Sequence, residues 1–161
     1  MSLRDLLTES VANWEQLGHP ALLERFVLRH GKEYTPVKRK GRKRKAKECF
    51  SNATARMLEN GDTYVEGFAV RTTFQLPLLH AWVTTNGTDA MDPTLDAMDF
   101  EYFGVAFDRT TVTNEIVRNK CYGLLDTGMI NYKFIFKIDP ELEQICKLVR
   151  TKRMREHVLE S

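Results

Sequence analysis

Hydrophobic residues near the start of the chain recur every three or four positions, which is the spacing of one face of a helix. This pattern runs over residues 2–17 and returns from residue 22 to about residue 30. Gly18 and Pro20 interrupt it, and proline suits the first turn of a new helix. The pattern therefore predicts two N-terminal helices.

Residues 32–47 lack this periodicity, because Lys and Arg dominate the segment and Pro36 and Gly41 interrupt it. Like charges at this density repel one another, so we expect an exposed loop. Helical spacing returns at Cys49 and stops at Gly61, within a sequence typical of turns. A helix is therefore predicted to begin at Cys49.

Two segments rich in β-branched and aromatic residues follow, at 63–74 and 78–85, and both compositions are typical of strands. The sequence NGTD at 86–89 predicts a hairpin turn. A short third strand at 90–92 then ends at Pro93. The middle of the chain is therefore expected to form an antiparallel sheet.

The last third of the chain gives weaker signals. Residues 100–108 suit either a short helix or a strand at a sheet edge, and residues 111–119 are weakly helical. Aromatic residues alternate with Lys and Ile over 132–138, which predicts a strand. From Pro140 the apolar spacing predicts a C-terminal helix that continues into a basic tail at about 150–161.

This order of elements indicates an α+β fold. N-terminal helices and the Cys-bearing helix would pack on an antiparallel sheet, and a C-terminal helix would complete the fold. A length of 161 residues is typical of one domain, so we expect residues 1–161 to fold together.

Charge is distributed unevenly along the chain. The net charge is only +2, but eight of the 24 basic residues lie between positions 38 and 47, where no acidic residue occurs. The rest of the chain has 16 basic and 22 acidic residues, a net charge of −6. The basic run consists of Lys38, Arg39, Lys40, Arg42, Lys43, Arg44, Lys45 and Lys47.

The three cysteines, Cys49, Cys121 and Cys146, argue against a disulfide framework, because their number is odd and their spacing is irregular. No CxxC pair indicates zinc, and no metal or cofactor is expected. The N-terminus does not resemble a signal peptide, and no apolar stretch approaches the roughly 20 residues of a membrane span. We expect a cytoplasmic protein in which Cys121 and Cys146 have structural roles.

Cys49, His80 and Asp92 form the main candidate for chemistry. Cys49 lies at a predicted helix N-terminus, where backbone N–H groups and the helix dipole favour a thiolate. In a hairpin centred on the NG turn, two residues face each other when their residue numbers add up to about 173. His80 therefore lies opposite roughly position 93, next to Asp92. The carboxylate would then orient the imidazole, as a catalytic triad requires.

The segments CFSNA, YVEGFA, HAWV, MDPT and YFG between residues 49 and 104 resemble the papain-like cysteine hydrolase superfold in its transglutaminase-like arrangement. They are also similar to a group of uncharacterised small proteins of bacteria and their phages. The resemblance implies acyl transfer or hydrolysis at an amide, peptide or isopeptide bond through a thioester. It makes Cys49 the nucleophile, His80 the general base and then acid, and Asp92 the orienting group.

The oxyanion hole is only partly assigned by the sequence. Many papain-like proteases have a Gln shortly before the nucleophile, but residues 43–48 contain none, and Gln16 and Gln75 are distant in sequence. The backbone N–H of Cys49 supplies one donor. The second donor has no candidate.

Two further residues have alternative interpretations. Trp82 shares the strand face of His80, so it either lines the active-site cleft or packs in the core. Glu66 lies on the predicted central strand, where it either supports the triad as an outer partner or faces solvent.

The basic run also has several interpretations. It attracts an acidic protein, peptide or nucleotide substrate to the cleft, it binds nucleic acid non-specifically, or it is a solvated loop. No aromatic residues are interleaved for base stacking, which favours electrostatic recruitment. The alternative to an enzyme is therefore a non-catalytic module that binds nucleic acid or acidic proteins through residues 38–47. A third interpretation is an inhibitor or effector of a host protein, which would combine catalysis with such binding.

Overall fold

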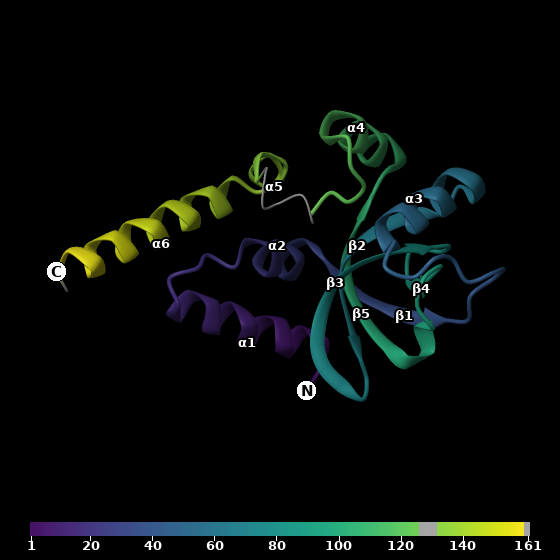
Figure 1. Ribbon diagram of the computed structural model, residues 1–161, viewed down its shortest axis with the longest axis horizontal. Coiled ribbons are helices and arrows are strands. Elements are labelled where there is room, and N and C mark those ends of the chain that lie inside the picture. The colour runs from purple at the N-terminus through teal and green to yellow at the C-terminus, as the bar shows by residue number, and fades with distance from the viewer. Residues whose placement is uncertain (126–131, 160–161) are drawn as a thin grey trace.

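The computed structural model describes residues 1–125 and 132–159, with backbone only for 156–159 (Figure 1). Five strands close into a small barrel in the order β1-β4-β3-β2-β5. Neighbouring strands are antiparallel except for β1 and β4, which are parallel. The strands are β1 (Lys32–Val37), β2 (Thr63–Arg71), β3 (Phe74–Thr84), β4 (Asp89–Met91) and β5 (Phe100–Phe107).

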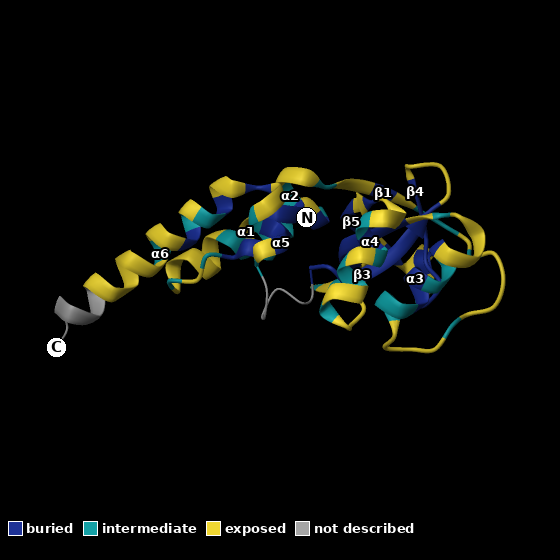
Figure 2. Ribbon diagram, turned by 90° about the horizontal axis from the view of Figure 1, so that it is seen from above, coloured by how far each residue is buried: buried dark blue, intermediate teal, exposed yellow. Residues whose placement is uncertain are grey.

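Helices lie against the outside of this barrel, which confirms the predicted α+β class. Figure 1 shows α1, α2, α5 and α6 gathered on one side, and α3 and α4 on another. The long helix α6 projects away from the barrel, and most of its surface is exposed (Figure 2). The helices are α1 (Leu3–Gln16), α2 (Leu22–His30), α3 (Cys49–Asn60), α4 (Arg109–Asn119), α5 (Lys133–Ile138) and α6 (Pro140–Leu159), with a 3₁₀ turn η1 (Ala97–Asp99).

The sheet separates two hydrophobic clusters, because successive side chains of a strand point to opposite faces. The larger cluster lies between the outside of the sheet and the helices. The smaller cluster fills the barrel, and all five strands contribute to it. Its members are Tyr34, Val65, Ala69, Trp82, Ala90, Ala97, Phe100 and Tyr102.

A glycine of β5 makes room for the largest side chain inside the barrel. Gly67 of β2 pairs with Gly104 of β5. A Cβ atom on Gly104 would lie 2.6 Å from the Cη2 atom of Trp82, which real contacts do not allow. Glycine at this position therefore lets β5 approach closely over the Trp82 ring.

The structure changes two of the sequence-based assignments near the barrel. The segment 100–108, predicted as either helix or edge strand, contains β5, which pairs with both β1 and β2. The exposed loop expected over 32–47 is shorter, because residues 32–37 form β1. Only Tyr34 of β1 is buried, so the sequence of this strand shows little hydrophobic pattern.

The strand predicted over 132–138 is wrong, because this segment contains the helix α5. Its rings meet at helical spacing: Tyr132 and Phe136 lie 5.9 Å apart between centroids. Phe134 packs on Phe107 of β5, with 5.7 Å between ring centroids. Contact with the barrel therefore overrides the local alternation.

The expected basic tail also differs from its prediction, because α6 extends through residue 159 and includes most of it. No helix in the described part of the chain is both long enough and apolar enough to cross a lipid bilayer.

Candidate active site

The hairpin of β3 and β4 brings His80 and Asp92 together. Val83 pairs with Met91, so the residue numbers of facing positions add up to 174, one more than the position of the NG turn predicted. Asp92 follows β4 directly, and its Oδ2 lies 2.7 Å from Nε2 of His80. Both residues are buried, with 5% exposure for His80 and none for Asp92.

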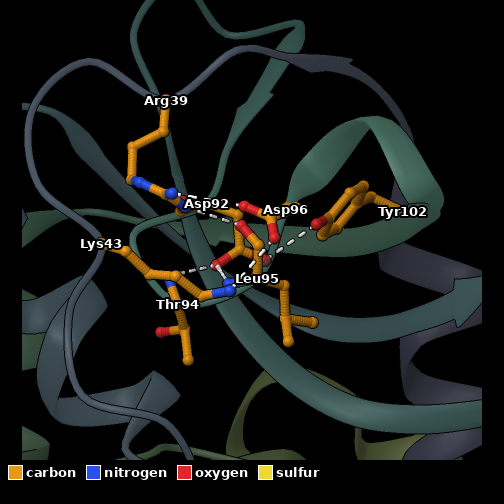
Figure 3. Close-up of polar contacts among 7 residues, drawn as sticks. All are labelled: Arg39, Lys43, Asp92, Thr94, Leu95, Asp96 and Tyr102. Carbon is orange, nitrogen blue, oxygen red and sulfur yellow. Dashed lines mark hydrogen bonds and ion pairs between the residues drawn. The ribbon is translucent and has the colours of Figure 1, made fainter.

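Asp92 is held from several directions (Figure 3). Its Oδ1 accepts hydrogen bonds from the backbone N–H groups of Thr94 at 2.7 Å and Leu95 at 2.9 Å. Its Oδ2 accepts one from the hydroxyl of Tyr102 at 2.8 Å. Burial alone would raise the pKa of Asp92, but the hydrogen bond and charge of His80 and these N–H donors lower it below its usual range. Asp92 is therefore a fixed carboxylate.

Cys49 is the second residue that acts on the His80 imidazole. It is the first residue of α3 and is partly buried. Its side chain is close enough to His80 to raise the pKa of the imidazole. Because Nε2 of His80 is bound to Asp92, the ring nitrogen left for the sulfur is Nδ1. One imidazole thus interacts with both the cysteine side chain and the carboxylate.

These contacts determine the charge of His80. Burial alone would lower its pKa, because a low-dielectric environment disfavours the imidazolium. The hydrogen bonds and charges of Asp92 and Cys49 outweigh burial and raise the pKa to about 9. His80 is therefore mainly protonated at neutral pH, next to Cys49.

The start of α3 suits a negative charge. Its N-cap residue, Glu48, makes no side-chain capping hydrogen bond, and the first turn contains no acidic residue. The first intrahelical bond runs from Asn52 N to Glu48 O at 2.9 Å, so the N–H groups of the preceding residues have no partner inside the helix. A thiolate or an oxyanion at Cys49 would complement these donors and the helix dipole.

Asn52 connects the Cys49 helix to the Asp92 turn. Its side-chain amide donates to the Lys45 carbonyl at 2.8 Å and to Oγ1 of Thr94 at 3.0 Å. Asn52 is 7% exposed and Thr94 is 3% exposed, so this link is shielded from solvent. It fixes the distance between the two parts of the site.

The structure supports core packing for Trp82, rather than a place in a cleft. The side chain is fully buried inside the barrel. Its ring stacks on that of His80 with 6.4 Å between centroids and meets the ring of Tyr102 edge-on at 4.9 Å. Trp82 therefore supports the imidazole from within the core.

Neither interpretation proposed for Glu66 fits the structure. The side chain is fully buried, so it does not face solvent. It pairs in register with Ala81, the neighbour of His80, and therefore lies on the opposite face of the sheet from the triad. Its carboxylate accepts hydrogen bonds from the backbone N–H groups of Leu124 and Leu125, each at 2.7 Å. Glu66 thus anchors the segment that follows α4.

Half of the basic run is engaged in ion pairs with the rest of the protein. Arg39 and Lys43 both bind the carboxylate of Asp96, at 3.3 Å and 3.1 Å (Figure 3). Arg44 pairs with Glu59, and Lys45 with Glu48. Within the described residues, the other members of the run make no ion pair: Lys38, Lys40, Arg42 and Lys47.

Arg39 also binds the turn that contains the candidate catalytic aspartate. It donates hydrogen bonds to the carbonyl of Leu95 at 3.0 Å and, more weakly, to that of Asp92 at 3.4 Å. Its side chain is only 17% exposed. This part of the basic run therefore braces the Asp92 turn.

Sequence reasoning missed Tyr102 and Asn52 as parts of the site. The Tyr102 ring lies in the barrel core. The available signal was that a buried tyrosine hydroxyl needs a hydrogen-bond partner. Asn52 in the CFSNA segment gave a similar signal, because a polar residue on the buried side of a helix needs a partner.

Other regions of the protein are separate from this site. Two cavities, of about 550 and 530 Å³, lie beside α4 and α5 and beside α1, and neither is lined by Cys49, His80 or Asp92. No group of His, Cys, Asp and Glu in the described part of the chain is arranged to hold a metal ion. Cys146 is buried in the core, whereas Cys121 is exposed.

Comparisons with known protein families, curated proteins and solved structures give no match for this chain.

Proposed function

We propose that this protein is a thiol-dependent hydrolase or acyltransferase that acts on an amide, peptide or isopeptide bond. One observation supports this most directly: the imidazole of His80 is hydrogen-bonded to the Asp92 carboxylate and lies close enough to the Cys49 side chain for the two to interact. The order of these residues and their positions on a helix, a strand and a strand end are those of the papain-like, transglutaminase-like arrangement. A cytoplasmic, reducing location would keep the thiol available.

In the proposed reaction, the Cys49 thiolate attacks the substrate carbonyl carbon, and the carbonyl electrons move to oxygen. Backbone N–H groups at the start of α3 stabilise this oxyanion. The intermediate then collapses to a thioester, and His80 donates its proton to the departing amine. Neutral His80 next takes a proton from water or from an acceptor amine, which attacks the thioester and releases Cys49.

Asp92 and Tyr102 act on this reaction through His80. The carboxylate stabilises the imidazolium and holds the ring so that Nδ1 faces the sulfur. The Tyr102 hydroxyl and the N–H groups of Thr94 and Leu95 keep the carboxylate in place. They are positioning groups, because none of them touches the reacting atoms.

Acyl-enzyme trapping tests this function. The protein is incubated with a p-nitrophenyl ester and its intact mass is measured, followed by peptide mapping. We expect one acyl group on Cys49, and no adduct in the Cys49→Ala variant. The Cys121→Ala variant is the matched control and should acylate normally. Equal labelling of Cys121, or an adduct that persists without Cys49, would contradict the proposal.

A second candidate function is non-catalytic binding of nucleic acid or an acidic protein through residues 38–47. It is favoured by the four basic side chains of this run that make no ion pair within the described residues. Such binding would weaken steeply with salt and would survive Cys49→Ala. Loss of this binding after neutralisation of residues 38–47, together with an unreactive Cys49, would favour this alternative over the enzyme.

A further inference from the structure

Five cationic side chains surround one small cavity next to the Asp92 turn. The cavity has a volume of about 200 Å³, and its cationic lining is Arg39, Lys40, Arg42, Arg44 and Arg56. Met91 and Pro93, the two neighbours of Asp92 in the chain, complete the lining. The basic run therefore forms a concave site together with α3, and Arg56 belongs to this site although it lies outside the run.

The cavity keeps a positive charge after its ion pairs are counted. Arg39, Arg44 and Arg56 pair with Asp96, Glu59 and Asp62. Lys40 and Arg42 make no ion pair within the described residues. Asp96 and Glu59 are 62% and 55% exposed, so their pairs are weak enough to exchange for a stronger anion.

Hydrogen bonds hold the rim of the cavity in place. The backbone N–H of Arg44 donates to the Pro93 carbonyl at 2.8 Å, and Arg56 donates to the Lys40 carbonyl at 3.3 Å. Arg39 is fixed by the carbonyl of Leu95. Its Nε atom is buried and has no hydrogen-bond partner in the described structure. The rim of the site is therefore preorganised.

We propose that this cavity binds the phosphate groups of a compact anion. Guanidinium groups match phosphate oxygens with paired N–H donors, and four of the five cations are arginines. Pockets for drug-sized ligands usually measure about 300–1,000 Å³, so this smaller volume suits one or two phosphate groups better than a complete nucleotide. The base and sugar of a nucleotide would then remain outside the cavity.

The site does not depend on the proposed thioester chemistry, because its lining does not include Cys49 or His80. Binding should therefore be unchanged in the Cys49→Ala variant. A failure of anion binding and a failure of acyl transfer are separate results.

Isothermal titration calorimetry of the full chain with pyrophosphate tests this site, at about 0.15 M salt to screen non-specific attraction. We expect one saturable site, and about tenfold or greater weakening in the Lys40→Gln/Arg42→Gln variant. The control variant Arg150→Gln/Lys152→Gln removes the same charge from exposed positions of α6 and should bind as the wild type does.

Two further ligands distinguish the sources of phosphate. ADP binding as tightly as pyrophosphate would support a site that recognises the phosphates of a nucleotide, and weaker ADP binding would support a free oligophosphate. The absence of saturable binding by either ligand would overturn the proposal. Equal weakening in the control variant, or binding of a single-stranded oligonucleotide alone, would also overturn it.

Discussion

In the part of the chain that the structure describes, two His–Asp pairs have almost equal lengths but lie in different surroundings. His80 Nε2 lies 2.7 Å from Oδ2 of Asp92, inside the end of the barrel. His30 Nε2 lies 2.8 Å from Oδ2 of Asp139, where α2 meets α6. The side chain of His80 is 6% exposed, whereas that of His30 is 32% exposed.

The second partners of the two pairs also differ. Asp139 is shared with Arg29, whose Nε lies 2.9 Å away and which keeps a permanent positive charge beside the carboxylate. Burial would raise the pKa of Asp139, but His30 and Arg29 lower it. Asp92 instead receives neutral donors, from Tyr102 and two backbone N–H groups. Of these two histidines, His80 is the one whose pKa is raised by a neighbouring cysteine, Cys49.

The comparison shows that a short His–Asp distance does not by itself make a catalytic site. In the pair of His30, Arg29 already neutralises the charge of Asp139. The geometry of this pair therefore explains only how two helices dock against each other. In the pair of His80, the Asp92 carboxylate and the nearby sulfur outweigh burial and favour an imidazolium that can exchange its proton with a nucleophile.

The largest predicted difference concerns thiol reactivity. At about pH 6, His80→Asn should slow alkylation of Cys49 about a hundredfold, because an unassisted thiol is almost entirely protonated at this pH. His30→Asn should leave the rate unchanged. Rates are measured with iodoacetamide and peptide mass spectrometry, and circular dichroism verifies that both variants are folded. Equal effects of the two substitutions would remove the distinction between the pairs.

Stability should separate the two aspartates. Asp92→Asn should lower the free energy of unfolding by about 3 kcal/mol, because it breaks a buried, fully hydrogen-bonded pair. Asp139→Asn should cost about 1 kcal/mol, because both of its partners are partly exposed to solvent. Urea denaturation monitored by circular dichroism measures both values. A larger loss for Asp139→Asn would be inconsistent with the contrast in burial.

The charge of His80 can be followed directly by NMR titration. In the wild type its imidazole should titrate near pH 9, so it is positively charged at neutral pH and loses its proton as the pH rises through that value. Cys49→Ala should lower this pKa, because the substitution removes one of the interactions that stabilise the imidazolium. An unchanged pKa in Cys49→Ala would mean that the sulfur does not interact with the ring.

The smallest predicted effect is that of Tyr102→Phe. This change deletes one buried hydrogen bond to Asp92 without altering the packing of the ring, and should cost about 1 kcal/mol of stability. Alkylation of Cys49 at about pH 6 should slow only a few-fold, since His80 and both backbone donors remain. A loss as large as that in His80→Asn would mean that Tyr102 has a more direct role.

Local sequence patterns predicted the parts of the molecule that depend on local interactions. The helix at Cys49 and the hairpin at the NG turn follow from periodicity and turn chemistry, and the hairpin register was one residue from the observed pairing. That accuracy was sufficient to place His80 beside Asp92, because the diagonal neighbour of a paired residue is still within reach.

Features that depend on distant segments were not predictable in this way. β1 is largely polar and is defined by its pairing with β4 and β5, and α5 is defined by packing against Phe107. Arg56 became part of the basic cavity only because α3 folds back beside the basic run. Burial of Glu66 likewise reflects the position of Leu124 and Leu125, almost 60 residues later.

The pH profile of alkylation in the wild-type protein tests the central claim most directly, because Cys121 is an exposed reference in the same molecule. At pH values below its pKa, an unassisted thiol reacts about tenfold faster for each unit by which the pH is raised, because its thiolate fraction rises. We predict that the rate for Cys49 changes little between about pH 6 and 8, while that for Cys121 rises steeply. Parallel profiles for the two cysteines would contradict a thiolate–imidazolium pair at Cys49 and His80.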